Sequence, residues 1–214
     1  MNHAHLRSCS AHPPTFILAS KSPRRAQMLR ELGLHFEQAE PPFDDPPQPE
    51  MLDHESPGAL AAHLAEKKAC SLAATISKNS TILAADTICV DFQNNLIGTP
   101  TTESEAREMI HTFSNCDHQV VTGVCLIQTN TGAPSTIVNQ FADTATVTLG
   151  HLTDMQIQDY LHLNTWPGKA GGYNLTERLE VGWPITVEGD STTVVGLPMI
   201  KLKTVLTKLG FLPT

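Results

Sequence analysis

The chain mixes two hydrophobic periods, and this mixture predicts strands and helices in alternation. Largely apolar runs at 16–19, 81–90 and 119–128 predict buried strands, the second of which is interrupted by Asp86 and Thr87. From about 57 to 76, apolar residues recur at helical spacing, which predicts a helix. Because strands and helices are interspersed and at least one strand pair is joined by a short turn, we expect an α/β protein with a mixed sheet.

Capping and turn residues predict where several elements begin and end. Thr102 with Glu105, and Thr153 with Gln156, have the spacing of capping boxes, which predicts helices to about residues 113 and 163. Residues 129–132 predict a turn between two strands, the second ending near residue 149. The last helix is expected to run to about residue 209.

The turn after the first strand is the most informative local sequence. Ser22 is a typical helix N-cap and Pro23 a typical first helical residue, so Arg24 and Arg25 fall in the first turn. Cations at this end oppose the helix dipole, which favours anions there. Two arginines, the hydroxyls of Ser20 and Ser22, and backbone N–H groups on one strand-to-helix turn predict a phosphate site.

Two charged residues interrupt apolar surfaces. Lys68 stands four residues from both Leu64 and Leu72, so it projects from the apolar face of its helix. Such a lysine extends its amine to solvent, pairs with an acid or reaches into a cleft. Asp86, followed by Thr87, lies inside an apolar strand, where a carboxylate is costly unless it is paired, protonated or bound to a metal. We therefore favour a functional role for Asp86.

Two loops carry further candidates. Asp44 and Asp45 lie in the proline-rich segment 41–57, either as a solvated turn or as a carboxylate pair that helps to hold a divalent cation. The glycine-rich loop 168–173 contains Lys169. Glycines let backbone approach a ligand closely, although they also serve ordinary turns.

Composition narrows the classes of function. With 214 residues, 40% hydrophobic and 17% charged, the chain can form one large domain or two joined lobes. A net charge of -8 without a basic tract argues against nucleic-acid binding. No apolar run approaches the ~20 residues of a membrane span. Five widely spaced cysteines favour free thiols in the cytoplasm. We expect residues 1–14 to be a flexible extension and 15–214 to be a single domain.

Several of these segments occur in a familiar order, and on them the chain resembles the Maf family, also called Maf-like nucleotide pyrophosphatases. The matching segments are 18–25, 64–69, 85–87, 118–124, 169–173 and 194–198. The resemblance implies two lobes around an elongated mixed sheet with a central cleft. It also implies hydrolysis of a nucleoside triphosphate to the monophosphate and pyrophosphate, helped by Mg²⁺ or another divalent cation such as Mn²⁺ or Co²⁺, in a homodimer.

The resemblance and the residue chemistry together suggest roles. Asp86 would bind the metal and orient or deprotonate the attacking water, and Asp45 would be a second group on the metal side. The catalytic candidates are Asp86, Lys68 and Arg25. The candidates for binding the substrate and its phosphates are Ser20, Ser22, Arg24, Arg25, Lys68, Lys169, Thr87 and His118. For His118, a purely structural role is an open alternative.

Three positions depart from the family pattern. Thr99 stands where a lysine is expected, Cys116 where an arginine is expected, and Thr176 where a glutamine is expected. The lysine-containing loop is nearer to the branch that acts on pyrimidine triphosphates than to the 7-methyl-GTP branch. The departures leave a second hypothesis open, a nucleotide-binding regulator that has lost turnover and is linked to cell division.

Overall fold

A computed structural model describes residues 15–43, 56–91 and 93–213. Its strands are β1 (Thr15–Ala19), β2 (Glu37–Ala39), β3 (Ser80–Val90), β4 (Leu96–Ile97), β5 (Cys116–Asn130), β6 (Ala133–Leu149) and β7 (Ile185–Glu188). Its helices are α1 (Pro23–Glu31), α2 (Pro57–Ala73), α3 (Glu103–Phe113), α4 (Asp154–His162), the 3₁₀ turn η2 (Ala170–Gly172), α5 (Leu175–Glu180), α6 (Ser191–Val195) and α7 (Met199–Lys208).

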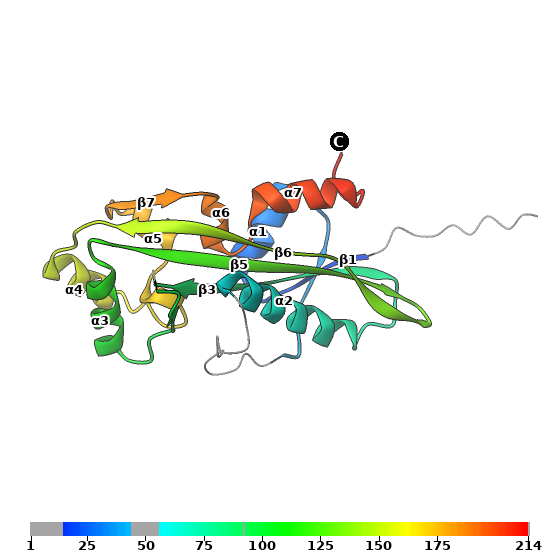
Figure 1. The fold of residues 1–214 in the computed structure, drawn as a ribbon, viewed down its shortest axis with the longest axis horizontal. Helices are drawn as coiled ribbons and strands as arrows, with labels where there is room; N and C mark the ends of the chain where they lie inside the picture. Colours follow the sequence, from blue (N-terminus) through cyan, green and yellow to red (C-terminus); the bar gives the residue numbers. More distant parts are fainter. Residues whose placement is uncertain (1–14, 44–55, 92, 214) are drawn as a thin grey trace, which may run out of the picture.

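The strands form one seven-stranded mixed sheet, which confirms the predicted fold class. Its order is β2-β1-β3-β5-β6-β7, with β4 paired to β3. β1 runs parallel to both β2 and β3, whereas the other pairs are antiparallel. The long hairpin of β5 and β6 runs along the molecule (Figure 1). Over the described residues, no helix is both long and apolar enough to cross a membrane.

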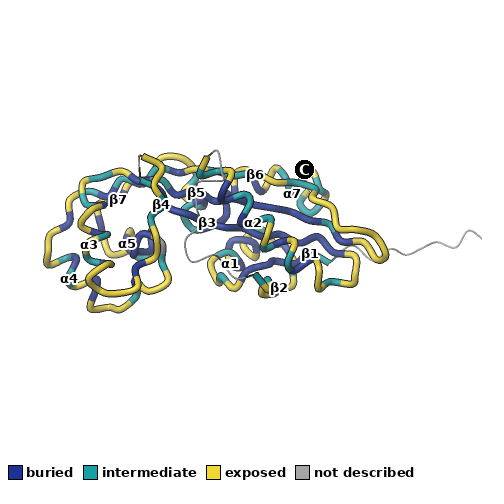
Figure 2. The backbone as a smooth tube through the Cα atoms, turned by 60° about the horizontal axis from the view of Figure 1, so that its bottom comes forward, coloured by how far each residue is buried: buried dark blue, intermediate teal, exposed yellow. Residues whose placement is uncertain are grey.

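Helices cover both faces of the sheet at one end. α1 and α7 lie on one face and α2 on the other (Figure 1). Leu29 of α1 and Leu202 of α7 join one buried cluster, while Ala65 and Leu72 of α2 join another on the opposite face. The central strands are accordingly buried along most of their length (Figure 2). A sheet covered on both faces explains why β3 is apolar from Ile82 to Val90, apart from Asp86 and Thr87.

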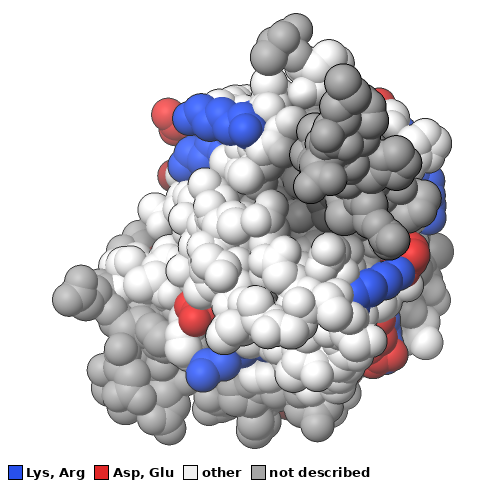
Figure 3. Space-filling view, turned by 90° about the vertical axis from the view of Figure 1, so that its right-hand side faces the viewer, with Lys and Arg blue, Asp and Glu red and all other residues white. Residues whose placement is uncertain are grey.

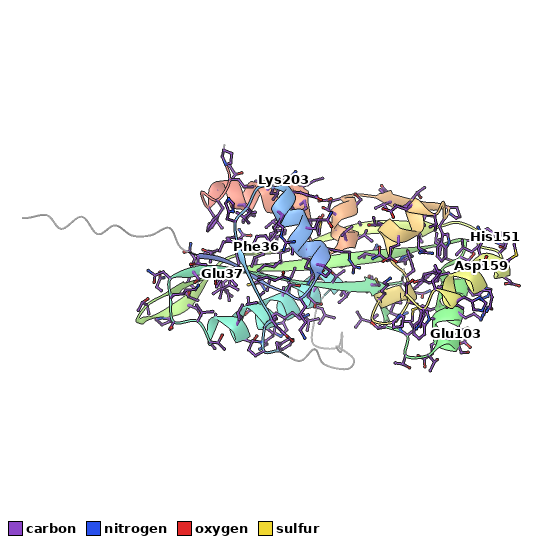
Figure 4. The ribbon with its side chains drawn as sticks, turned by 180° about the vertical axis from the view of Figure 1, so that it is seen from behind. Phe36, Glu37, Glu103, His151, Asp159 and Lys203 are labelled. Atoms are coloured by element: carbon purple, nitrogen blue, oxygen red, sulfur yellow. The ribbon has the colours of Figure 1, made fainter. Side chains whose placement is uncertain are left out.

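A second lobe forms at the other end of the long strands. α3, α4, η2, α5 and β7 pack around a separate cluster that includes Ile110, Tyr160 and Trp183. Figure 4 places Glu103, His151 and Asp159 at this end, and Phe36, Glu37 and Lys203 toward the other. This cluster is the core of the second lobe, and the two clusters on opposite faces of the sheet belong to the first, in agreement with the two lobes that the resemblance implies.

Most predicted ends are confirmed, while one helix end and one capping interaction differ. The Thr153–Gln156 capping box is present in full. At α3, Thr102 caps the helix as predicted, but the Glu105 carboxylate accepts from the backbone N–H and hydroxyl of Thr101 instead. α2 ends at Ala73 rather than near residue 76, because the carbonyls of its last turn are taken by a following turn.

The end of the molecule near β1 carries mixed charge. On its visible part, basic side chains lie beside acidic ones and form no continuous basic patch among the described residues (Figure 3). Lys78 is an example, with its amine 2.8 Å from the Glu37 carboxylate.

Candidate functional site

The candidate site lies at a gap in the sheet edge. On one side of β3, Ser80–Ala84 pair with β1 and Cys89–Val90 pair with β4. Within the described part of the chain, residues 85–88 have no strand partner on that side. Because β1 ends at Ala19, opposite Ala84, Ser20 and the start of α1 follow directly beside the gap. Ligands in open α/β sheets bind at the carboxyl ends of strands in this way.

The turn into α1 is built as the sequence predicts, and its two serine hydroxyls accept hydrogen bonds within the turn. The Ser22 hydroxyl accepts from the Arg25 backbone N–H at 3.4 Å, which makes it the N-cap. The buried Ser20 hydroxyl accepts from the Ser22 backbone N–H at 3.2 Å. Pro23 occupies the first helical position. Both hydroxyls therefore shape the turn, and Arg24 projects from it as an exposed cation on the cleft wall.

Arg25 is fixed by contacts to three separate parts of the chain. Its Nε donates to the Gly196 carbonyl at 2.9 Å, its Nη1 to the Ser20 hydroxyl at 3.3 Å and its Nη2 to the Thr87 hydroxyl at 3.1 Å. These bonds join α1, β3 and the turn after α6. Arg25 is thus a half-buried cation of defined orientation, whereas Arg24 is exposed.

Asp86 and Lys68 form a close ion pair on the opposite face of β3 from Thr87, because side chains alternate along a strand. Both side chains are largely buried, with 11% and 13% exposure. Gly123 of β5, paired with Asp86, lets α2 approach the sheet, since a Cβ there would lie 2.1 Å from the Ala61 carbonyl carbon. Because residue 123 has no side chain, α2 packs close enough to the sheet for Lys68 to reach Asp86.

Lys169 lies on the second lobe and is paired with an acid. Its amine lies 3.0 Å from the Glu177 carboxylate, and its side chain is only 15% exposed. The preceding Gly168 has a φ of 73°, in the left-handed region that glycine tolerates without strain. The sequence predicted Lys169 in a glycine-rich loop that either approaches a ligand or serves an ordinary turn, and its partner Glu177 lies eight residues further on, in α5.

His118 is a buried neutral group. Its Nε2 lies 2.9 Å from the Tyr173 hydroxyl, and its ring stacks on Phe113 with a centroid distance of 4.6 Å. The residue is 2% exposed, and burial lowers the pKa of its imidazole to about 4. His118 contributes to the cleft wall without positive charge at neutral pH, which favours the structural alternative for this residue.

A cleft of about 290 Å³ lies between the lobes. One lobe contributes Arg24, Arg25 and Thr87, and the other contributes Lys169 and Tyr173. The remaining wall includes apolar and polar groups: Cys89, Val120, Leu175, Val194, Val195, Asn174, Thr99 and Thr176. One part of the wall is therefore cationic and another part apolar, which suits an anion attached to a ring.

Two of the three departures from the family pattern line this cleft. Thr99 and Thr176 are exposed on its wall, and Cys116 is half-buried at the start of β5. Cys89 also faces the cleft, but burial raises the pKa of its thiol to about 12, so it is protonated at neutral pH and is a poor nucleophile.

The predicted site residues thus fall into two groups on either side of the open edge of β3. Arg24, Arg25 and Lys169 belong to the cleft, while Asp86 and Lys68 lie on the α2 face. Asp45 lies outside the described residues, as does the predicted extension 1–14. The sequence predicted no role for Val194 and Val195, which line the cleft, or for the Gly196 carbonyl, which accepts from Arg25. All three residues lie in segment 194–198, one of those on which the chain resembles the Maf family.

The residues present suit a divalent cation held together with a ligand. Among the described residues, no three His, Cys, Asp or Glu side chains gather closely enough to hold a metal ion. Asp86 offers one carboxylate at the open edge. Mg²⁺ is commonly bound by one or two carboxylates together with substrate phosphates, and the donor set fits that arrangement.

The fold and the site define a two-lobed α/β protein with a cleft, lined in part by cationic side chains, at an interrupted sheet edge. A family model described as Maf-like protein matches residues 15–209, so the chain belongs to the Maf-like protein family. A Nitrosococcus oceani relative named 7-methyl-GTP pyrophosphatase is 35% identical, covering 94% of this chain and 96% of that protein. A Hyphomonas neptunium relative named dTTP/UTP pyrophosphatase is 35% identical, covering 91% and 95%.

Among solved structures, that of the Staphylococcus aureus Ham1 protein aligns with a TM-score of 0.41 at 13% identity. The alignment covers 63% of this chain and 71% of the Ham1 chain.

Proposed function

We propose that the chain is a nucleoside triphosphate pyrophosphatase that releases the monophosphate and pyrophosphate. The observation that carries the proposal is the buried Asp86–Lys68 pair at the open edge of β3, beside the cationic turn of α1. A carboxylate and a lysine thus lie on one side of the gap, and two arginines lie on its other side. The names of the two relatives support the same reaction class.

In the proposed reaction, a water molecule attacks the α-phosphorus. The Asp86 carboxylate accepts the proton of this water, a bond forms between the water oxygen and phosphorus, and the bond from phosphorus to the bridging oxygen breaks. Pyrophosphate leaves with the electron pair. Arg24 and Arg25 on one lobe and Lys169 on the other stabilise the negative charge that develops on the phosphoryl oxygens.

We also propose a divalent cation as cofactor. Asp86 would supply a carboxylate to it, with Asp45 as a further candidate, and the cation would neutralise charge on the phosphate oxygens. Lys68 holds Asp86 in place through their ion pair. Activity with Mg²⁺, Mn²⁺ and Co²⁺, each compared with a chelator, tests this proposal.

For the substrate, we propose a pyrimidine or modified nucleoside triphosphate. Lys169 supports a pyrimidine substrate, because the lysine-containing loop is nearer to the pyrimidine branch of the family. The Thr99 and Thr176 side chains on the cleft wall support altered base recognition, because they replace charged or amide groups.

The deciding experiment is a panel of triphosphates incubated with pure protein and each of the three cations. The panel contains dTTP, UTP, CTP, 7-methyl-GTP, ATP and GTP, and the readout is released pyrophosphate. Turnover of at least one member supports the proposal. Folded protein that releases no pyrophosphate from any of them would refute it.

A nucleotide-binding regulator without turnover is the second candidate. The observation that favours it is Glu177, which neutralises the single lysine of the glycine-rich loop. Calorimetry with the same panel separates the two functions, since a regulator binds a triphosphate and forms no product.

We further propose a homodimer in the cytoplasm. The dimer rests on the family resemblance alone, and light scattering of the purified protein tests it. The compartment is supported by four cysteines that are free of disulfides in the described part of the chain: Cys70, Cys89, Cys116 and Cys125.

A further inference from the structure

A chain of threonines leads from Arg25 into the protein interior. The Thr87 hydroxyl accepts from Arg25 Nη2 at 3.1 Å and lies 2.8 Å from the Thr122 hydroxyl. Thr122, which is 0% exposed, lies 2.7 Å from the Thr193 carbonyl. The Thr193 hydroxyl in turn lies 2.9 Å from the Asp143 carboxylate. The chain therefore links α1, β3, β5, α6 and β6.

The direction of each hydrogen bond follows from the groups involved. A carbonyl oxygen only accepts, so Thr122 donates its single proton to the Thr193 carbonyl. The bond between the two hydroxyls must then be donated by Thr87. With its proton committed, Thr87 presents lone pairs to the Arg25 guanidinium, which only donates.

While the chain is intact, the Thr87 hydroxyl is an acceptor aimed at Arg25, so it has no proton to donate to a phosphate oxygen. Consecutive bonds of one direction polarise one another, and the charge on Arg25 strengthens the first of them. The Gly196 carbonyl, directly after α6, accepts from Arg25 Nε. The Thr193 carbonyl of α6 accepts from Thr122, so one segment holds both ends of the chain.

We propose that Thr122 and Thr87 are positioning residues that fix the orientation of Arg25. The inference rests on the proposed function only for its kinetic consequence, because the geometry of Arg25 is a property of the unliganded protein. Thr122 touches no part of the cleft and acts through Thr87. A hydroxyl buried in a sheet core costs free energy unless it is hydrogen-bonded. The bonds of Thr122 to Thr87 and to the Thr193 carbonyl remove this cost.

The first test measures Arg25 directly by NMR, through solvent exchange of its side-chain N–H groups. The signals are assigned by their loss in Arg25→Lys. In Thr122→Val, which keeps the branched shape without the hydroxyl, we expect exchange to accelerate roughly fivefold, the equivalent of the neutral hydrogen bond to Thr87 that the variant loses. Thr122→Ser, which keeps the hydroxyl, should restore slow exchange.

Thr129→Val is the matched control. Thr129 is a buried threonine of the same strand, bonded to the Lys78 carbonyl at 2.7 Å, far along β5 from Arg25. We expect this variant to leave Arg25 exchange unchanged. Urea unfolding of all variants separates a loss of stability from a loss of Arg25 order.

The second test uses turnover in a double-mutant cycle. We expect Thr122→Val to lower kcat/KM roughly tenfold in the wild-type background and by less than about threefold in Arg25→Lys, because its effect passes through Arg25. Equal losses in both backgrounds, or unchanged Arg25 exchange in Thr122→Val, would overturn the proposal. If no triphosphate is hydrolysed, the proposed function fails and the exchange measurement still decides this inference.

Discussion

Lys169 and Glu177 face each other on the second lobe, with the lysine Nζ 3.0 Å from the carboxylate Oε2. Lys169 is the basic residue that this lobe contributes to the cleft lining, and Glu177 forms an ion pair with it. An incoming triphosphate therefore has to compete with Glu177 for this amine. The pair sets how much of the Lys169 charge is available to the ligand.

Removing the charge of Glu177 should therefore strengthen substrate binding. We expect Glu177→Gln to lower KM two- to fivefold at low salt with little change in kcat, because a partly exposed ion pair is worth at most about 1 kcal/mol. The measurement is KM for the preferred triphosphate at low and high ionic strength. Glu180→Gln, an exposed acid on the same helix, is the control. An equal decrease in both variants would mean that net charge alone is responsible.

The exposed arginine of the α1 turn should contribute mainly to binding. We expect Arg24→Ala to raise KM several-fold, because Arg24 lines the cleft and meets the phosphates in a solvent-accessible position. The effect should shrink as salt is added. Arg30→Ala, which removes an exposed arginine from the last turn of the same helix, serves as control. A KM that rises equally in both variants would contradict a specific contact.

Local sequence rules predicted the elements that carry the site. The N-cap at Ser22, the proline after it and the uninterrupted strand around Asp86 each depend on neighbours a few residues away. Lys68 projecting from an apolar helix face was equally visible in the 3.6-residue period. For that reason, the cationic turn and the buried acid could both be found without a structure.

The partners of these residues could not be predicted, because they depend on contacts across the sequence. Nothing near Arg25 indicates that the Gly196 carbonyl, 171 residues away, fixes its Nε. The side-chain alternation that separates Asp86 from Thr87 is predictable, but which face meets α2 is decided by how the helix packs at Gly123. Eight residues and an intervening turn separate Lys169 from Glu177, so their contact also requires the fold.

Loss of the Asp86 charge should remove most turnover. We expect Asp86→Asn to reduce kcat by about 10²–10⁴, the range typical of a general base, while the isosteric amide keeps the strand packing. Pyrophosphate release and circular dichroism measure the two properties. Asp117→Asn, an exposed acid on β5, should retain activity. Unchanged turnover in Asp86→Asn would remove this residue from the mechanism.

The buried imidazole of His118 should make stability depend on pH. Its pKa falls from 6.5 to about 4 because burial disfavours the charged form. Between these values the unfolded chain binds a proton that the folded chain does not, so stability is lost as pH falls from 6.5 to 4. This group alone should lower the free energy of unfolding by about 3 kcal/mol across that window.

The comparison variant is His118→Gln, which cannot titrate and keeps a polar group near Tyr173. Urea unfolding at pH 7 and pH 4 should show a smaller loss of stability in the variant than in the wild type. An equal loss in both proteins would mean that His118 already titrates freely in the folded state. Acidic groups titrate in both proteins, so the difference isolates the histidine.

The close approach of α2 to β5 should make Gly123 intolerant of any side chain. A Cβ at this position would lie 2.1–2.3 Å from backbone atoms of Ala61 and Ala62, which cannot move without shifting the helix. We expect Gly123→Ala to destabilise the fold by more than about 3 kcal/mol, as overpacking against backbone does. Gly98→Ala is the matched control, because no atom lies within 4 Å of a Cβ there. If Gly123→Ala has wild-type stability, α2 does not pack this close to the sheet. The Lys68–Asp86 ion pair depends on this packing and would then not form as described.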